Sequence, residues 1–226
     1  MRLLWLRAWL AFAASTNPLI AGFIRFERDS FPNNDEPIVP HVEAPTATDM
    51  STAVMKTFSS LGDNEQYSTG TGGLSGCTIM YIISRKGVYA THWWENMSFS
   101  PDEIWREPVT QTDRELFQST VFNMLTSGGR FHPKLDAELI KEDGIQAYLI
   151  YPKRTFAKGA GDEIQTTVGR LVPTLQDQSR WTDMPGTHGK NLFKYDPARK
   201  LGGGQTQHLA MLWAENEKEA YHHDQW

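Results

Sequence analysis

One cysteine and one histidine have the types and spacing needed for nucleophilic catalysis. Cys77 is the only cysteine of the 226-residue chain, and it directly follows a glycine-rich segment, residues 69–76. His92 comes fifteen residues later. An imidazole beside a thiol can take its proton, and the thiolate–imidazolium pair is a strong nucleophile. A single cysteine cannot form a disulfide within the chain. It is therefore a working thiol, one half of an intermolecular bridge, or a buried and inert side chain.

A hairpin is the element that must bring these two side chains together. Residues 78–84 form a β-branched and apolar run, residues 85–87 read as a tight turn, and residues 88–95 return as a second strand. Cys77 and His92 then lie at the same end of the hairpin. They are unequally far from the turn, so we expect a bulge or an offset register between the strands.

The glycine-rich segment supplies further candidates for the site. The backbone N–H groups of Ser75, Gly76 and Cys77 could stabilise the oxyanion of a tetrahedral intermediate, because glycines allow close approach of a substrate. A third group must orient the histidine in a triad. Thr71 could do so for His92, by its side chain or its carbonyl. The residues alone fit an ordinary loop threonine equally well.

Further candidate residues lie directly after the histidine. Trp93 and Trp94 directly follow His92, and one of them could wall the pocket and exclude water, although both could equally be packing residues. Asn96 begins the chain's Asn-Met-Ser glycosylation sequon. A glycan at Asn96 would lie close to the site, so the sequon is either unused or points away from it.

The N-terminus predicts a secreted protein. Residues 1–22 carry Arg2 and Arg7, an apolar run, small residues at cleavage positions and no acidic residue, which is typical of a signal peptide. A mitochondrial presequence is the alternative, since it is also arginine-bearing and poor in acids. We expect an extended, proline-rich leader over residues 23–45 and a single catalytic domain over residues 46–226.

Composition excludes several classes of protein. The chain is 39% hydrophobic and 12% aromatic, which indicates a globular domain. Its formal charge of −5 and the lack of a basic stripe argue against a nucleic-acid partner. No later apolar stretch is long enough for a membrane helix. The histidines and carboxylates lack metal-ligand spacing, and no phosphate loop is present, so we expect no metal and no cofactor.

The remaining pattern predicts an α/β domain of the α+β type with a mainly antiparallel sheet. We expect helices over residues 49–61, from Thr112 to the glycines at 128–129, and over residues 164–175. Residues 144–151 and 209–213 read as strands, residues 180–204 as a long loop, and the histidines at 222–223 as part of a frayed tail.

The segment around the cysteine resembles a known family. Leu74-Ser75-Gly76-Cys77, followed by a strand and then His92, resembles the bacterial toxin deamidases of the cytotoxic necrotizing factor type and their smaller lethal-factor relative. The resemblance implies a β-sandwich-like core flanked by helices, with Cys77 as nucleophile and His92 as its partner. It also implies that Thr71 completes the triad, as a threonine does in the lethal-factor relative.

The same resemblance implies a function. Family members hydrolyse a glutamine side-chain amide of a host protein, so we expect a secreted toxin or effector, a monomer, acting on a protein substrate. Two other functions fit the residues. One is a non-catalytic secreted effector or binding protein. The other is a different cysteine hydrolase, either a peptidase or a transglutaminase-like enzyme.

Overall fold

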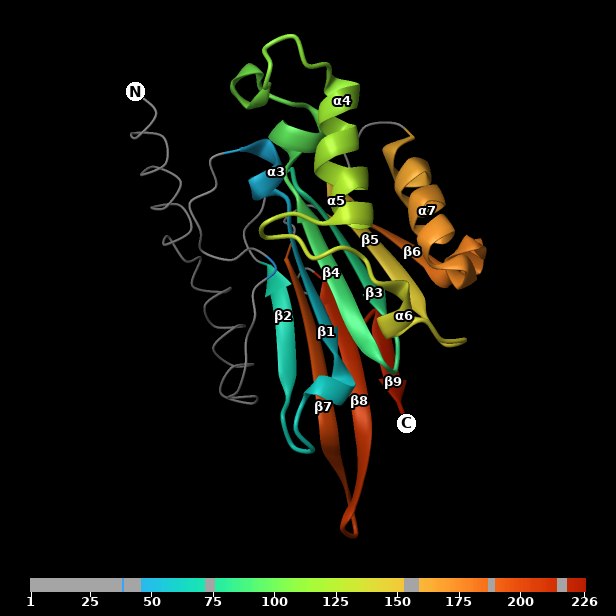
Figure 1. The fold of residues 1–226 in the computed structure, drawn as a ribbon. Coiled ribbons are helices and arrows are strands. Elements are labelled where there is room, and N and C mark those ends of the chain that lie inside the picture. The colour runs from blue at the N-terminus through green and yellow to red at the C-terminus, as the bar shows by residue number, and fades with distance from the viewer. Residues whose placement is uncertain (1–37, 39–45, 72–75, 153–158, 187–189, 215–218) are drawn as a thin grey trace.

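The computed structural model describes residue 38 and residues 46–71, 76–152, 159–186, 190–214 and 219–226. The predicted signal peptide, residues 1–22, and all of the predicted leader except Ile38 lie outside this part of the chain. The described part is an α+β domain built on two stacked β-sheets (Figure 1), which confirms the predicted fold class. Within it, no helix is both long and apolar enough to cross a membrane.

The larger sheet has five strands in the order β1-β4-β3-β5-β6. All neighbours are antiparallel except the last pair, β5 and β6, which are parallel. The strands are β1 (Thr52–Thr57), β3 (Thr78–Ile83), β4 (Gly87–Trp93), β5 (Gln146–Pro152) and β6 (Trp181–Gly186).

The smaller sheet has four strands in the order β2-β7-β8-β9, all antiparallel. They are β2 (Tyr67–Thr71), β7 (Asn191–Gly202), β8 (Gln205–Ala214) and β9 (His222–Gln225). This sheet covers one face of the larger sheet, while α4, α5 and α7 cover the other face (Figure 1).

The helices of the described part are mostly short. They are α3 (Ala47–Met50), α4 (Asp113–Phe117), α5 (Asn123–Ser127), α6 (Ala137–Ile140) and α7 (Ala160–Leu171). A π-helical turn, Gln118–Phe122, joins α4 to α5, and another π-helical turn, Glu95–Phe99, follows β4. The predicted capping box is present: the Thr112 side chain accepts from the backbone of Glu115, whose carboxylate accepts from Thr112.

Strand β3 shows why residues 79–83 are apolar without the usual alternation of polar and apolar side chains. Alternate side chains of a strand point to opposite faces of a sheet. Ile79 and Tyr81 face the core between the two sheets, whereas Met80 and Ile82 face the core beneath the helices. Because both faces are covered, every residue of β3 is buried. The predicted strands 78–84, 88–95 and 144–151 are confirmed.

Three expectations for the chain are wrong. The predicted helix 49–61 is mostly strand β1, because pairing with β4 outweighs a helix-like apolar spacing. The predicted loop 180–204 holds β6 and all of β7. Strand β6 pairs with β5 and β7 pairs with β2, which are both distant in sequence, while β7 also forms a hairpin with β8, which follows it directly. The predicted frayed tail at residues 222–223 is part of β9, in which His222 is buried and its Nδ1 lies 2.9 Å from the hydroxyl of Tyr148.

Candidate active site

The register of the β3–β4 hairpin fixes the relation between the cysteine and the histidine. Ile79 is the direct cross-strand partner of His92, and the pairing continues without a shift to Thr78 and Trp93. The expected bulge is absent from this hairpin, because the backbone N–H of Ser84 bonds to the carbonyl of Gly87 and closes the turn. Cys77 precedes Ile79 by two residues, so it is the diagonal neighbour of His92.

Strand alternation places the side chain of His92 toward the smaller sheet. His92 shares the face of Val88 and Ala90, which belong to the core between the sheets, and the Ile79 face continues to Cys77. Both residues are buried, with 6% of Cys77 and none of His92 exposed. Cys77 lies one residue before β3 begins, so its place on the face of His92 follows from extending the strand alternation by one residue. Among the described residues no hydrogen-bond partner is found for either ring nitrogen of His92, so no bond joins the imidazole to the thiol in this arrangement.

The two tryptophans after His92 take different positions. Trp93 alternates to the other face of β4 and is fully buried in the core beneath the helices. Trp94 contacts the histidine instead: its ring meets the imidazole edge-on, with 4.8 Å between ring centroids and an interplanar angle of 85°. Of the two residues predicted to wall a pocket, Trp94 is therefore the one beside His92.

Thr71 faces the same layer from the smaller sheet. It is the last residue of β2. Because alternate residues of a strand share a face, Thr71 lies on the same face as Thr69 and as Tyr67, which belongs to the core between the sheets. Its hydroxyl accepts a hydrogen bond of 2.9 Å from the side-chain amide of Asn191. The oxygen of that amide accepts a short bond from the hydroxyl of Tyr81, on β3. A chain of side chains thus links Thr71 to the strand that follows Cys77.

Gly76 lies against the carboxylate of Glu95, which was not among the predicted site residues. Gly76 has a φ of +87°, and a Cβ at this position would collide with the Glu95 carboxylate and lie 3.3 Å from the Glu95 Cβ. Extending the β3–β4 register places Gly76 opposite Glu95. Counting outward from the two-residue turn would have found this pair. Ser75, the other predicted loop contributor, lies outside the described residues.

Burial controls the charge of the candidate pair. Burial raises the pKa of the Cys77 thiol to about 12, a hydrogen bond from the Glu95 backbone lowers it, and the Glu95 carboxylate raises it. Burial lowers the pKa of His92 to about 3. At pH 7 the thiol and the imidazole are both neutral in this arrangement. The thiolate–imidazolium pair expected from the sequence is not the resting form here, because neither charge is solvated.

The side chain of Asn96, the predicted glycosylation site, makes a hydrogen bond within the protein. Asn96 is half-buried in the π-helical turn, and its amide donates a hydrogen bond of 3.1 Å to the carboxylate of Asp102. Ser98, the third residue of the sequon, is buried. Glycosylation at Asn96 remains a prediction. Among the described residues, no group of three or more His, Cys, Asp or Glu side chains could hold a metal ion.

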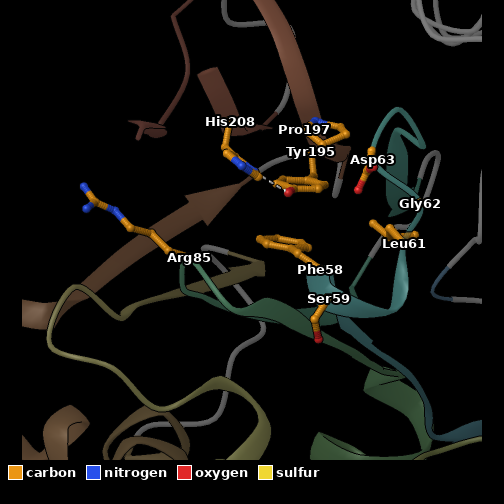
Figure 2. Close-up of a pocket in the computed structure, with 9 residues that line it drawn as sticks. All are labelled: Phe58, Ser59, Leu61, Gly62, Asp63, Arg85, Tyr195, Pro197 and His208. Atoms are coloured by element: carbon orange, nitrogen blue, oxygen red, sulfur yellow. Dashed lines mark hydrogen bonds between the residues drawn. The ribbon is translucent and has the colours of Figure 1, made fainter. Parts of the chain in front are cut away.

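A pocket lies beside the turn of the β3–β4 hairpin, where Arg85 lines it (Figure 2). The register places His92 at the other end of the hairpin. It encloses about 440 Å³. Its lining residues are Phe58, Ser59, Leu61, Gly62, Asp63, Arg85, Tyr195, Pro197 and His208. The Phe58 and Tyr195 rings stack at 3.7 Å, and the Tyr195 hydroxyl lies 2.6 Å from Nδ1 of His208. No local sequence pattern marks this pocket, because its walls come from β7, β8 and two distant turns.

Comparison with known proteins gives a distant structural likeness. No family model matches the chain, and no curated protein matches it. Among solved structures, the chain is similar to the C-terminal domain of CNFy from Yersinia pseudotuberculosis, with 12% sequence identity and a TM-score of 0.32. The match covers 77% of this chain and 57% of that chain. It is a distant structural similarity, and no conclusion about function follows from it.

Proposed function

We propose that the protein is a cysteine amidohydrolase that converts a glutamine side chain of a protein substrate to glutamate. The observation that carries this proposal is the hairpin register, in which Cys77 is the diagonal neighbour of His92 on one buried face. A thiol and an imidazole at the open end of a hairpin whose two strands are buried are the two groups that nucleophilic attack on an amide requires. The choice of glutamine follows the resemblance carried by residues 74–77.

The acylation step uses His92 as a general base, because the resting pair is neutral. As the Cys77 sulfur bonds to the carboxamide carbon, the thiol proton passes to His92 and the carbonyl oxygen becomes an oxyanion. The backbone N–H groups of Gly76 and Cys77 are the proposed donors to that oxygen. The oxyanion then collapses, the C–N bond breaks, and His92 returns its proton to the nitrogen. Ammonia leaves, and a thioester remains on Cys77.

The second step hydrolyses the thioester. A water molecule gives a proton to His92 as its oxygen bonds to the thioester carbon. The C–S bond then breaks, and the proton on His92 passes to the sulfur. The products are glutamate and the starting thiol, so the cycle needs no cofactor. We further propose that residues 1–22 direct secretion and that the protein acts as a monomeric toxin or effector.

The test is ammonia release from glutamine-containing substrates, first carbobenzoxy-glutaminyl-glycine and then a mixture of folded proteins. We expect release by the wild type and none by Cys77→Ser or His92→Gln. Mass spectrometry should locate the new glutamate. Incorporation of an added amine in place of ammonia release would indicate a transglutaminase, and cleavage of backbone amides would indicate a peptidase. Equal release by wild type and Cys77→Ser would rule out the proposal.

A second candidate, a binding protein, is favoured by the pocket in Figure 2. Its stacked Phe58 and Tyr195 rings, with Asp63 and Arg85 in its walls, suit a ligand that is aromatic and charged. NMR titration with aromatic amines and aromatic acids would test this. Saturable shifts at Tyr195 and His208 that persist in Cys77→Ser would support binding. No shifts at these residues would remove the support.

A further inference from the structure

Thr52 is the residue that directly faces His92 on the neighbouring strand. The two are cross-strand partners in the β1–β4 ladder. Thr52 lies on the same face of β1 as Val54, which belongs to the core between the sheets. The side chains of Thr52 and His92 therefore both point toward the smaller sheet. Directly opposed side chains of an antiparallel pair have their Cβ atoms roughly 5 Å apart. A hydroxyl on Thr52 is therefore within reach of the imidazole.

Both groups carry buried polar atoms without partners. Among the described residues, no hydrogen-bond partner is found for Oγ1 of Thr52 or for Nδ1 and Nε2 of His92. Thr52 is 3% exposed and His92 is fully buried. A buried polar group without a partner is costly, and native structures rarely retain one. The two groups are complementary, because a hydroxyl can accept from an imidazole N–H or donate to the bare nitrogen.

The backbone of Thr52 is held in place independently of its hydroxyl. The Thr91 hydroxyl donates a bond of 3.1 Å to the carbonyl of Thr52 and also lies 2.8 Å from Nε2 of the buried His132. With its backbone fixed in the ladder, Thr52 can reach the ring of His92 by rotation about its Cα–Cβ bond. Such a rotation moves the hydroxyl between staggered positions and leaves the strand unchanged.

The strand order places Thr52 and Cys77 on opposite sides of His92. Strand β4 lies between β1 and β3 in the sheet. Thr52 therefore flanks His92 on one side, and Cys77 approaches from the other. Across three adjacent strands the order is hydroxyl, imidazole, thiol. This is the order in which an orienting group, a base and a nucleophile work together.

We propose that Thr52 is the positioning residue for His92: its hydroxyl hydrogen-bonds the ring nitrogen remote from Cys77 and fixes the tautomer of the imidazole. The catalytic part of this inference rests on the proposed amidohydrolase function. When His92 takes the thiol proton, the same hydroxyl accepts from the imidazolium and stabilises it. Thr71 is a weaker choice for this role, because its hydroxyl already accepts from Asn191.

Thr69 provides a matched control. Its hydroxyl is also buried and has no hydrogen-bond partner among the described residues. Thr69 lies on the same face of β2 as Tyr67, which belongs to the core between the sheets. It belongs to β2, however, and is paired with Phe193, not with His92. Thr69→Val therefore removes a buried hydroxyl of the same kind without removing the one that faces the imidazole.

The experiment records the histidine ring nitrogens of the full-length protein by ¹⁵N NMR, with the His92 signals identified by their loss in His92→Gln. We expect a single His92 tautomer in the wild type and in Thr52→Ser. In Thr52→Val we expect both tautomers or the opposite one, and in Thr69→Val no change. If Thr52→Val does not fold, Thr52→Ala replaces it. His92 signals that are identical in the wild type and in the hydroxyl-free variant would overturn the inference.

Activity separates this inference from the proposed function. With carbobenzoxy-glutaminyl-glycine, Thr52→Val should lower kcat by about 10- to 100-fold, the effect of one hydrogen bond to a charged group, and Thr52→Ser should restore most of it. The tautomer measurement needs no substrate. A wild type that releases no ammonia would refute the amidohydrolase, while the NMR result would still decide whether Thr52 orients His92.

Discussion

The carboxylate of Glu95 occupies the space that a side chain at Gly76 would need. The contact lies at the open end of the hairpin, one residue before Cys77, and the backbone of Gly76 has a φ of +87°. Glu95 also acts on the thiol, because its backbone hydrogen bond lowers the pKa of Cys77 while its carboxylate raises it. Gly76 is therefore required both for the turn of the chain and for the position of an acidic neighbour of the cysteine.

Replacing this glycine should be costly for two separate reasons. Gly76→Ala places a Cβ in the left-handed region and against the Glu95 carboxylate, so we expect the free energy of unfolding to fall by about 1–3 kcal/mol. Urea unfolding measures the loss. Gly203→Ala is the control, since Gly203 has a φ of +63° but open space around it. Equal losses in both variants would mean that the Glu95 contact contributes nothing.

Tyr81→Phe should weaken the link between the two sheets. The Tyr81 hydroxyl donates to Asn191, whose amide in turn donates to Thr71. The variant keeps the ring but leaves the buried oxygen of Asn191 without its donor, which costs about 1–3 kcal/mol of unfolding free energy. If Thr71 contributes to catalysis, kcat should fall as well. Denaturant unfolding and ammonia release measure the two effects.

Thr71→Val distinguishes these effects of Tyr81→Phe. It removes the acceptor at the end of the chain and leaves the bond between Tyr81 and Asn191 in place. A loss of activity in both variants would assign Thr71 a part in the reaction. A loss of stability without a loss of activity would limit the three residues to holding the sheets together.

The sequence could predict the hairpin because its signals are local. An apolar β-branched run, a tight turn and a returning strand lie within residues 78–93. The register was not predicted, because the turn expected over residues 85–87 has only two residues between Ser84 and Gly87, which removes the expected bulge. The apolar spacing of residues 49–61 misled the helix prediction, because β1 gains its stability from β4, whose paired residues lie 30 to 40 positions along the chain. Strand β7, within the predicted loop, pairs on one side with β2, which is distant in sequence, and on the other with β8, which follows it directly.

The same limit applies to the candidate site. Cys77, His92 and Thr71 could be proposed from residue types and a motif, and their roles remain predictions. The opposition of Thr52 to His92 could not be predicted, since it requires knowing that β1 pairs with β4 and in which register. The neutral state of the thiol depends on burial by elements far away in sequence, which no local pattern reveals.

Buried histidines should make the protein unstable in acid. Burial lowers the pKa of His132 to about 4, whereas an unfolded histidine has a pKa near 6.5. As the pH falls below about 6.5, the unfolded state binds the proton first, so the folded state loses stability progressively down to about pH 4. At pH 5 this histidine alone should lower the unfolding free energy by about 2 kcal/mol relative to pH 7.5.

Urea unfolding at both pH values checks this expectation. His92 and His222, whose pKa values burial lowers to about 3 and about 4, act in the same direction. His132→Gln should lower stability at pH 7.5, because a bond to Thr91 is disturbed, but it should also reduce the dependence on pH. His223→Gln, at an exposed position, is the control. An unchanged pH dependence in His132→Gln would show that this histidine is protonated equally in both states.

The reactivity of Cys77 tests the charge state of the pair directly. Because burial raises its pKa to about 12, the native thiol at pH 8 should react with iodoacetamide on the order of 1,000-fold more slowly than the same cysteine in denaturant. Glu95→Gln removes the unfavourable charge but keeps the backbone hydrogen bond, so the reaction should become faster. Glu103→Gln, at an exposed position away from the hairpin, should change nothing.

The pH dependence of alkylation decides between two forms of catalysis. A rate that keeps rising above pH 9 is expected for a neutral thiol, and it would require His92 to take the proton during attack on the substrate. A midpoint below the free-cysteine value of about 8.5 that rises in His92→Ala would instead demonstrate a thiolate–imidazolium pair in solution. In that case the ion pair would have to be stabilised by an arrangement of Cys77 and His92 that differs from the buried, neutral one.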